Sequence, residues 1–139
     1  MNEHQLPEDD LLSGKGKILV LDDESIVLML MEFSLPSLGY EVETVDNGEQ
    51  AIQMYEEAAQ NKAPFSLVIM DLFIPGGMGG SETAEKILEN HPKALLIISS
   101  GDGTNPIMAN PLQYGFQAAV HKPFDLKKLS HLLHTLLQS

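Results

Sequence analysis

The stretch KILVLDD at residues 17–23 decides the fold, because a continuous apolar run ends there directly in two carboxylates. Four apolar residues in a row have the length and composition of a strand that is buried on both faces of a sheet. The arrangement recurs in three later stretches: SLVIMD at 66–71, ALLIISS at 94–100 and AAVHK at 118–122. Each run ends in polar side chains, so several buried strands are expected to deliver polar groups to one place.

Helical patterns separate these runs. The first predicted helix covers 24–35, and Pro36 is expected to end it because proline disrupts a helix interior. Four apolar residues at helical spacing mark this helix: Ile26, Val27, Leu30 and Phe33. A strand with alternating apolar and polar residues follows at 40–45, which is typical of the edge of a sheet.

The rest of the chain continues the alternation of strands and helices. Asn47-Gly48 is a turn signal, and a glycine-rich loop covers 75–80. The remaining expected elements are strands at 65–70, 95–98 and 116–120 and helices at 49–60, 81–90, 105–114 and 125–137. Five strand–helix repeats predict an α/β fold, a doubly wound five-stranded parallel sheet with helices on both faces.

The predicted strand ends gather a chemically coherent set of side chains. In an open doubly wound sheet, ligands bind beyond the carboxyl ends of the strands. The residues expected there are Asp22, Asp23, Asp71, Ser99, Ser100 and Lys122. Any one of them has a simpler explanation as a turn or helix cap, so the conjunction carries the argument.

Clustered carboxylates repel one another unless a cation lies among them, and Mg²⁺ prefers such oxygen ligands. We expect Asp22, Asp23 and Asp71 to hold this ion, together with the backbone carbonyl of Phe73. A carboxylate can attack phosphorus when metal and lysine neutralise the phosphoryl oxygens. Asp71 is therefore the expected nucleophile, and Lys122 the expected contact of the phosphoryl group.

Ser99 is expected to donate a hydrogen bond to another phosphoryl oxygen. Phosphorylation would then draw the loop that follows Ser99 inward and change the neighbouring face of the molecule.

These residues resemble those of the receiver domain of two-component response regulators, over about residues 17–137. The motifs that carry the resemblance are ILVLDDE at 18–24, DLFIP at 71–75, ISSG at 98–101 and KPF at 122–124. The resemblance implies a flavodoxin-like fold with strand order 2-1-3-4-5, the order already known for flavodoxin and for the chemotaxis receiver of this family. It also implies that Asp71 is the phospho-acceptor, that Asp22 and Asp23 hold Mg²⁺, and that a phosphohistidine on a histidine kinase or phosphotransfer domain is the donor.

The glycine-rich loop and the stretch GFQAAVHKPF at 115–124 are most similar to receivers at the C-terminal end of hybrid sensor histidine kinases. Two positions depart from the commoner receiver pattern. Ala119 stands where receivers often carry an aromatic switch residue, three positions before the lysine, and the loop after Asp71 is longer by one residue. The way in which phosphorylation reports to a partner is therefore left open.

Composition sets the outer bounds. The 139 residues fit one receiver domain at 17–139, preceded by a flexible arm at 1–16. The formal net charge of -12 opposes direct nucleic-acid binding and contact with an anionic membrane. The chain contains no cysteine and no apolar run long enough to span a bilayer, and its start lacks the features of an export signal. We expect a cytoplasmic monomer or weak dimer that is not an enzyme as an isolated domain.

Three other functions remain as alternatives. A magnesium-dependent aspartyl phosphatase of the haloacid-dehalogenase type would want a second aspartate two residues after the nucleophile, where this chain has Phe73. A flavin-binding module would want a hydroxyl-rich phosphate loop after the first strand, where this chain has three acidic residues. A pseudo-receiver would serve only as a docking surface.

Overall fold

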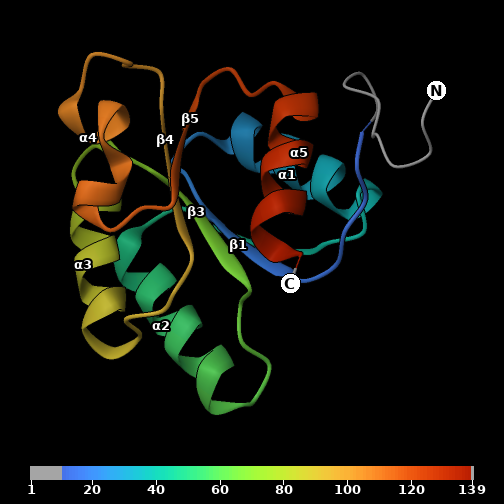
Figure 1. Cartoon of the computed structure of the whole chain (residues 1–139). Helices are drawn as coiled ribbons and strands as arrows, with labels where there is room; N and C mark the ends of the chain where they lie inside the picture. Colours follow the sequence, from blue (N-terminus) through green and yellow to red (C-terminus); the bar gives the residue numbers. More distant parts are fainter. Residues whose placement is uncertain (1–10, 139) are drawn as a thin grey trace.

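The computed structural model describes residues 11–138 as a five-stranded sheet, all parallel, between two layers of helices (Figure 1). The order of the strands is β2-β1-β3-β4-β5, as expected. The strands are β1 (Lys17–Leu21), β2 (Glu41–Val45), β3 (Leu67–Asp71), β4 (Leu96–Ser100) and β5 (Ala118–His121). The helices are α1 (Ser25–Ser37), α2 (Gly48–Gln60), α3 (Gly80–Asn90), α4 (Pro106–Ala109) and α5 (Leu126–Leu137), with a 3₁₀ turn, η1, at Pro111–Tyr114.

The apolar runs become central strands because alternate side chains fill two separate cores. Leu19, Met70 and Ile98 face the core beneath α2 and α3. Ile18 and Ile69 face the other core, beneath α1 and α5. A strand with helices on both sides has no face for water, which explains why these runs are continuous rather than alternating. The expected edge position of β2 is confirmed.

Helix α1 differs from the expectation in its end and in its packing. Pro36 lies inside the last turn, and the helix ends at Ser37, before Gly39 with a φ of 101°. A positive φ suits glycine and ends a helix, so Gly39 rather than Pro36 sets the boundary. The helix is apolar on nearly all sides: it buries Met31 and Leu35 and leaves its other apolar side exposed.

The exposed side of α1 carries three of the four residues that identified the helix in the sequence. Ile26 is 74% exposed, Leu30 49% and Phe33 80%. Met29, also exposed, lies on the same part of the surface. Four large apolar side chains on one helix form an unusual solvent-facing patch, which we call the α1 patch (Ile26, Met29, Leu30 and Phe33).

The expected helix over 105–114 is wrong in its length. The chain forms a single turn, α4, which Asn105 caps by accepting a hydrogen bond from the N–H of Ile107. Asn110 then leaves the helical region, and η1 begins at Pro111. A residue before proline is disfavoured in the helical conformation, so Pro111 divides the segment in two.

Residues 11–16 of the expected arm contact the domain, whereas residues 1–10 lie outside the described part of the chain. The N–H of Gly14 donates to the carbonyl of Leu38 at 2.8 Å, and the N–H of Leu12 donates to the hydroxyl of Ser130 at 3.3 Å. The boundary at residue 17 therefore stays a prediction.

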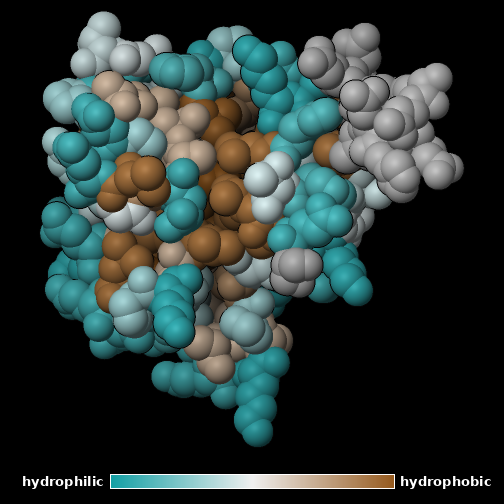
Figure 2. All heavy atoms as spheres, viewed as in Figure 1, coloured by the Kyte–Doolittle hydropathy of each residue, from teal (hydrophilic) through white to brown (hydrophobic). Residues whose placement is uncertain are grey.

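The edge strand β5 is half-buried along Ala118–Val120. Apolar atoms form a band down the middle of the face that Figure 2 shows.

Within residues 11–138, no helix is long and apolar enough to cross a membrane.

We predict that Gly80→Ala destabilises the fold. A Cβ at Gly80 would lie 2.6 Å from the carbonyl oxygen of Asp71 and 2.7 Å from the side chain of Ile98. Relief of such a clash typically costs about 1–3 kcal/mol. Urea unfolding of both variants provides the measurement, with Gly101→Ala as the control, since a Cβ there meets open space. Equal stability of the two variants would contradict the close approach of α3 to β3.

Candidate functional site

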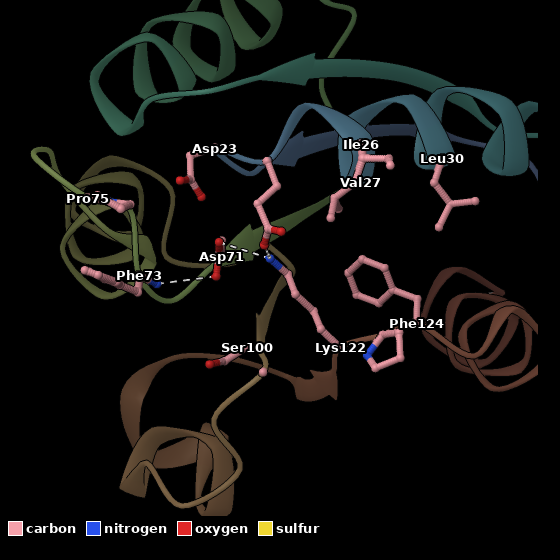
Figure 3. Close-up of a pocket in the computed structure, with 13 residues that line it drawn as sticks. Asp23, Ile26, Val27, Leu30, Asp71, Phe73, Pro75, Ser100, Lys122 and Phe124 are labelled. Atoms are coloured by element: carbon pink, nitrogen blue, oxygen red, sulfur yellow. Dashed lines mark hydrogen bonds and ion pairs between the residues drawn. The ribbon is translucent and has the colours of Figure 1, made fainter.

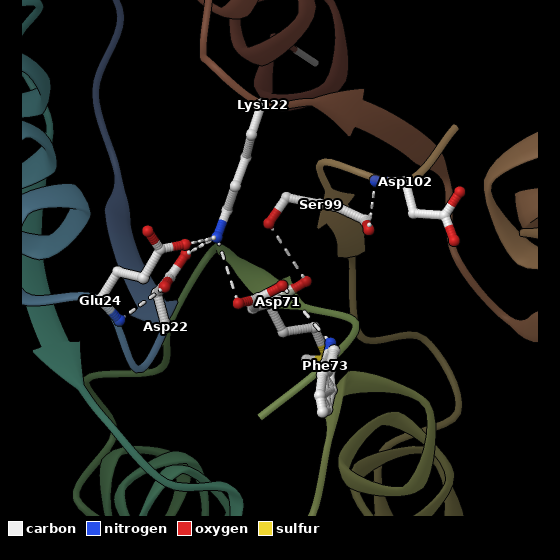
Figure 4. Close-up of polar contacts among 9 residues, drawn as sticks. Asp22, Glu24, Asp71, Phe73, Ser99, Asp102 and Lys122 are labelled. Atoms are coloured by element: carbon white, nitrogen blue, oxygen red, sulfur yellow. Dashed lines mark hydrogen bonds and ion pairs between the residues drawn. The ribbon is translucent and has the colours of Figure 1, made fainter. Parts of the chain in front are cut away.

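The carboxyl ends of four strands bring the expected polar residues to one edge of the sheet (Figure 4). Asp71 is the last residue of β3, and its Cα partner in β4 is Ser99. Asp22 follows β1, and Lys122 follows β5. The strand register thus places residues from four distant parts of the sequence around a single point.

Lys122 is the centre of this arrangement. Its Nζ lies 2.7 Å from Asp22 Oδ2, 3.1 Å from Asp71 Oδ2 and 3.0 Å from Glu24 Oε1. Burial lowers the pKa of Lys122, but the hydrogen bonds to these carboxylates outweigh burial and the pKa is raised. The ammonium group therefore stays charged across the physiological range and offsets part of the negative charge around it.

Asp71 is buried, with only 5% of its surface exposed. Burial, and then the charge of Asp22, raise its pKa to about 6, against the lowering effect of Lys122 and of the N–H of Phe73. That N–H donates to Asp71 Oδ1 at 3.4 Å. A carboxylate with this pKa gains from an additional cation, because a cation relieves the cost of its charge.

Four carboxylates can supply oxygens for such a cation. Those of Asp22, Asp23, Glu24 and Asp71 each offer an oxygen within 4.8 Å of all the others. A hard, oxygen-preferring ion such as Mg²⁺ fits this donor set. Asp22, Asp23 and Asp71 were expected in this role from the sequence. Glu24 was not expected at the site, and its carboxylate contacts Lys122. Its signal was present as the third acidic residue of the run at 22–24.

The two serines at the end of β4 have different environments. Ser99 is 1% exposed, and its hydroxyl donates to the carbonyl of Met70 at 3.5 Å. Ser100 lines the cavity that also contains Asp71 and Lys122, and its hydroxyl oxygen accepts a hydrogen bond from the N–H of Asp102 at 3.0 Å. The expected role of Ser99 stays a prediction, and the geometry adds Ser100 as a second candidate.

The cavity above Asp71 extends along the N-terminal half of α1 (Figure 3). Its volume is about 740 Å³. Side chains of Val27 and Leu30 point from α1 toward Phe124, which lies two residues after Lys122, and Ile26 lines the same cavity. Phe73 and Pro75 line the cavity next to Asp71. The Asp71 carboxylate thus lies at one end of an apolar groove, a feature that the spacing of apolar residues in α1 did not reveal.

Comparison with known protein families identifies the arrangement. The sequence pattern of the response regulator receiver domain matches residues 18–134. The chain belongs to the receiver domain family. The receiver has the five-stranded parallel fold with order 2-1-3-4-5 that this family shares with the flavodoxins.

Two curated relatives of the receiver carry different names and are longer than this chain. It is 32% identical over 125 residues to a probable transcriptional regulator, ycf27, of Cyanophora paradoxa, covering 90% of this chain and 49% of that protein. It is 32% identical over 117 residues to an NtrX-like response regulator of Rickettsia typhi, covering 84% of this chain and 24% of that protein. The chain therefore spans at most about half the length of these curated relatives.

A solved structure has the same fold. The receiver domain of a sensor histidine kinase from Pseudomonas aeruginosa PAO1, solved with a magnesium ion coordinated in its active site cleft, superposes with a TM-score of 0.77 at 24% identity. The match covers 91% of this chain and all of that one.

We predict that Asp71 makes the stability of the receiver depend on pH. Its pKa is about 6 when folded, and about 4 in an unfolded chain. Between these values the folded state binds the proton more tightly, so the free energy of unfolding falls as the pH rises from 4 to 7. Native protein should lose roughly 1–3 kcal/mol more than Asp71→Asn over this range.

Urea unfolding at pH 4.5 and 7.5 in a metal chelator measures this difference. Subtraction of the Asp71→Asn values removes the contribution of the other carboxylates. Addition of Mg²⁺ at pH 7.5 should restore stability to the native chain more than to the variant. Parallel pH profiles for the two proteins would contradict a raised pKa at Asp71.

Proposed function

We propose that the receiver accepts a phosphoryl group from a phosphohistidine onto Asp71 in a magnesium-dependent reaction and acts as a signalling switch. The observation that carries this proposal is the position of Asp71, buried at one end of a cavity with Lys122 and acidic side chains around it. We further propose that Asp22 and Asp23 hold the ion with Asp71, and that the Phe73 carbonyl completes the set of protein ligands.

The reaction requires an ionised Asp71. A carboxylate oxygen attacks phosphorus, the bond from phosphorus to the imidazole nitrogen breaks, and the donor histidine leaves as neutral imidazole after taking up a proton. With a pKa of about 6, Asp71 is largely ionised at neutral pH even without a metal. Mg²⁺, when bound, would supply charge neutralisation at the phosphoryl oxygens.

Recognition of the new phosphoryl group falls to Lys122 and the serines of β4. Ser99 is the hydroxyl expected from the sequence, and Ser100 is the one that lines the cavity. Because the Ser100 oxygen accepts the N–H of Asp102, its hydrogen is available to a phosphoryl oxygen. Movement of Ser100 would then carry the following loop, and with it α4, which gives the receiver a switch in which Ala119 has no part.

We propose that the phosphohistidine donor docks along the α1 patch. The patch and the cavity share Ile26 and Leu30, so a helix laid on α1 reaches Asp71 without leaving the groove. Amphipathic helices bind apolar grooves in this way. The negative charge around Asp71 does not attract an anionic donor. Apolar contact with the α1 patch would therefore supply the binding energy that holds the donor there.

For the parent protein we propose a hybrid sensor histidine kinase with this receiver at its C-terminal end. The resemblance of residues 75–80 and 115–124 supports this origin, whereas the curated relatives favour a transcriptional regulator with a further domain. Peptide mapping of the endogenous protein distinguishes them, since only the hybrid kinase would yield peptides of a histidine kinase catalytic domain.

Two of the three alternative functions, the phosphatase and the pseudo-receiver, have weaker support. A phosphatase is disfavoured by Phe73, which offers no second carboxylate after the nucleophile. A pseudo-receiver would dock partners without accepting a phosphoryl group, and the close grouping of Asp71, Asp22 and Lys122 argues against it.

We predict that acetyl phosphate with Mg²⁺ adds one phosphoryl group to the native receiver and none to Asp71→Asn. Intact-mass analysis detects the adduct, and a chelator should abolish it. Asp46→Asn serves as the control, because Asp46 is an exposed aspartate outside the acidic cluster. If the native chain gained no phosphoryl group from acetyl phosphate or from a phosphohistidine protein, the proposal would fail.

We predict that Leu30→Glu slows transfer from a phosphorylated histidine kinase tenfold or more, because a central apolar contact of an interface typically contributes about 2 kcal/mol. Phosphorylation by acetyl phosphate should change less than twofold, since this small donor needs no docking surface. Leu112→Glu is the matched control: Leu112 is an exposed leucine on η1, away from the groove. A similar loss in both variants would rule out α1 as the docking helix.

A further inference from the structure

Glu24 occupies an unusual position for a glutamate, the N-cap of α1. Residues at this position usually turn their side chain back to bond the free N–H groups of the first turn, and the short side chains of Ser, Thr, Asp and Asn are preferred. The side chain of Glu24 makes no such bond. It extends across the site instead, where its Oε1 lies 3.0 Å from Lys122 Nζ.

The backbone of Glu24 is fixed independently of its side chain. Its N–H donates to Asp22 Oδ1 at 2.9 Å, and its carbonyl accepts from the N–H groups of Val27 and Leu28. Removal of the carboxylate therefore leaves the start of α1 in place. The contact with Lys122 is a property of the side chain alone.

The contact completes the hydrogen bonding of Lys122. An ammonium group has three N–H donors. In this structure all three have carboxylate acceptors, in Asp22, Glu24 and Asp71. Lys122 cannot bind a phosphoryl oxygen with a full hydrogen bond until one of these carboxylates releases a donor.

Of the three carboxylates, Glu24 can release an N–H donor of Lys122 at the lowest cost in free energy. Its side chain is 56% exposed, against 1% for Asp22 and 8% for Asp71, so water can solvate it once the contact breaks. Exposed ion pairs contribute little to stability, and contacts of this kind can form and break without disturbing the fold.

We infer that Glu24 is a positioning residue that competes with the phosphoryl group for Lys122 and thereby slows phosphorylation of Asp71. The inference rests on the proposed function. In the unphosphorylated receiver, Glu24 holds the ammonium group at the outer side of the site. When a phosphoryl group arrives, Lys122 exchanges Glu24 for a phosphoryl oxygen, and Glu24 turns to water.

The test compares two substitutions that separate contact from charge. Glu24→Gln removes the charge and weakens the contact. Glu24→Asp keeps the charge but shortens the side chain, which at an N-cap favours bonds to the helix N–H groups over Lys122. We expect both variants to be phosphorylated by acetyl phosphate about two- to fivefold faster than native at saturating Mg²⁺, the range that an exposed pair permits.

A second measurement concerns the ammonium group in the absence of any donor. Lysine-selective ¹⁵N NMR should show slowly exchanging Lys122 ammonium hydrogens in the native receiver and faster exchange in both variants. Calorimetric titration with Mg²⁺ should give affinities within threefold of native. Glu89→Gln, an exposed change on α3, is the control and should match native in every measurement.

Several outcomes would overturn the inference. Native rates in both variants would show that Lys122 is not restrained, and a native rate in Glu24→Asp alone would make charge, not contact, the cause. A tenfold loss of Mg²⁺ affinity in Glu24→Gln would make Glu24 a metal ligand instead. These results leave the proposed function intact, whereas a native chain that takes up no phosphoryl group overturns both.

Discussion

Repulsion among carboxylates is the interaction on which the site depends. A parallel sheet places every strand end at one edge, and in this receiver three of the four acidic groups there come from a single run, Asp22–Glu24. Lys122 contacts three of the four carboxylates. One lysine leaves a net negative charge, and burial of Asp71 makes that charge costly. The site therefore carries an uncompensated negative charge, which a divalent cation would neutralise. The anionic phosphoryl group of the proposed reaction would in turn depend on that cation.

The sequence predicts the sheet well because strand burial leaves a strong signal. Runs such as Leu67–Met70 have no exposed face, so they are continuous and apolar, and polar residues appear only where the strands end. The carboxyl ends of all the parallel strands then lie at one edge of the sheet, whatever residues the loops contain. Asp22, Asp71 and Lys122 could be grouped from the sequence for this reason, although the distances between them could not.

Three features could not be predicted from the sequence, because they depend on the direction in which side chains point rather than on residue type. The spacing of apolar residues locates α1, but α1 is apolar on nearly all sides, and only packing decides that Leu35 is buried and Phe33 exposed. Adjacent serines point to opposite faces of a strand, so the twofold period of β4 separates Ser99 from Ser100. The reach of Glu24 toward Lys122 depends on a side-chain conformation that no pattern of residue types encodes.

The single turn of α4 has a thermodynamic consequence for the surface that it forms next to β5. A helix of four residues has few backbone hydrogen bonds to preserve, such as the one from the N–H of Asn110 to the carbonyl of Pro106 at 3.0 Å. Helix formation gains its cooperativity only over several turns. The order of α4 therefore depends on its Asn105 cap and on the buried side chain of Met108. Such a segment can unwind or re-form for a small change in free energy, so the surface next to β5 can change shape at little cost.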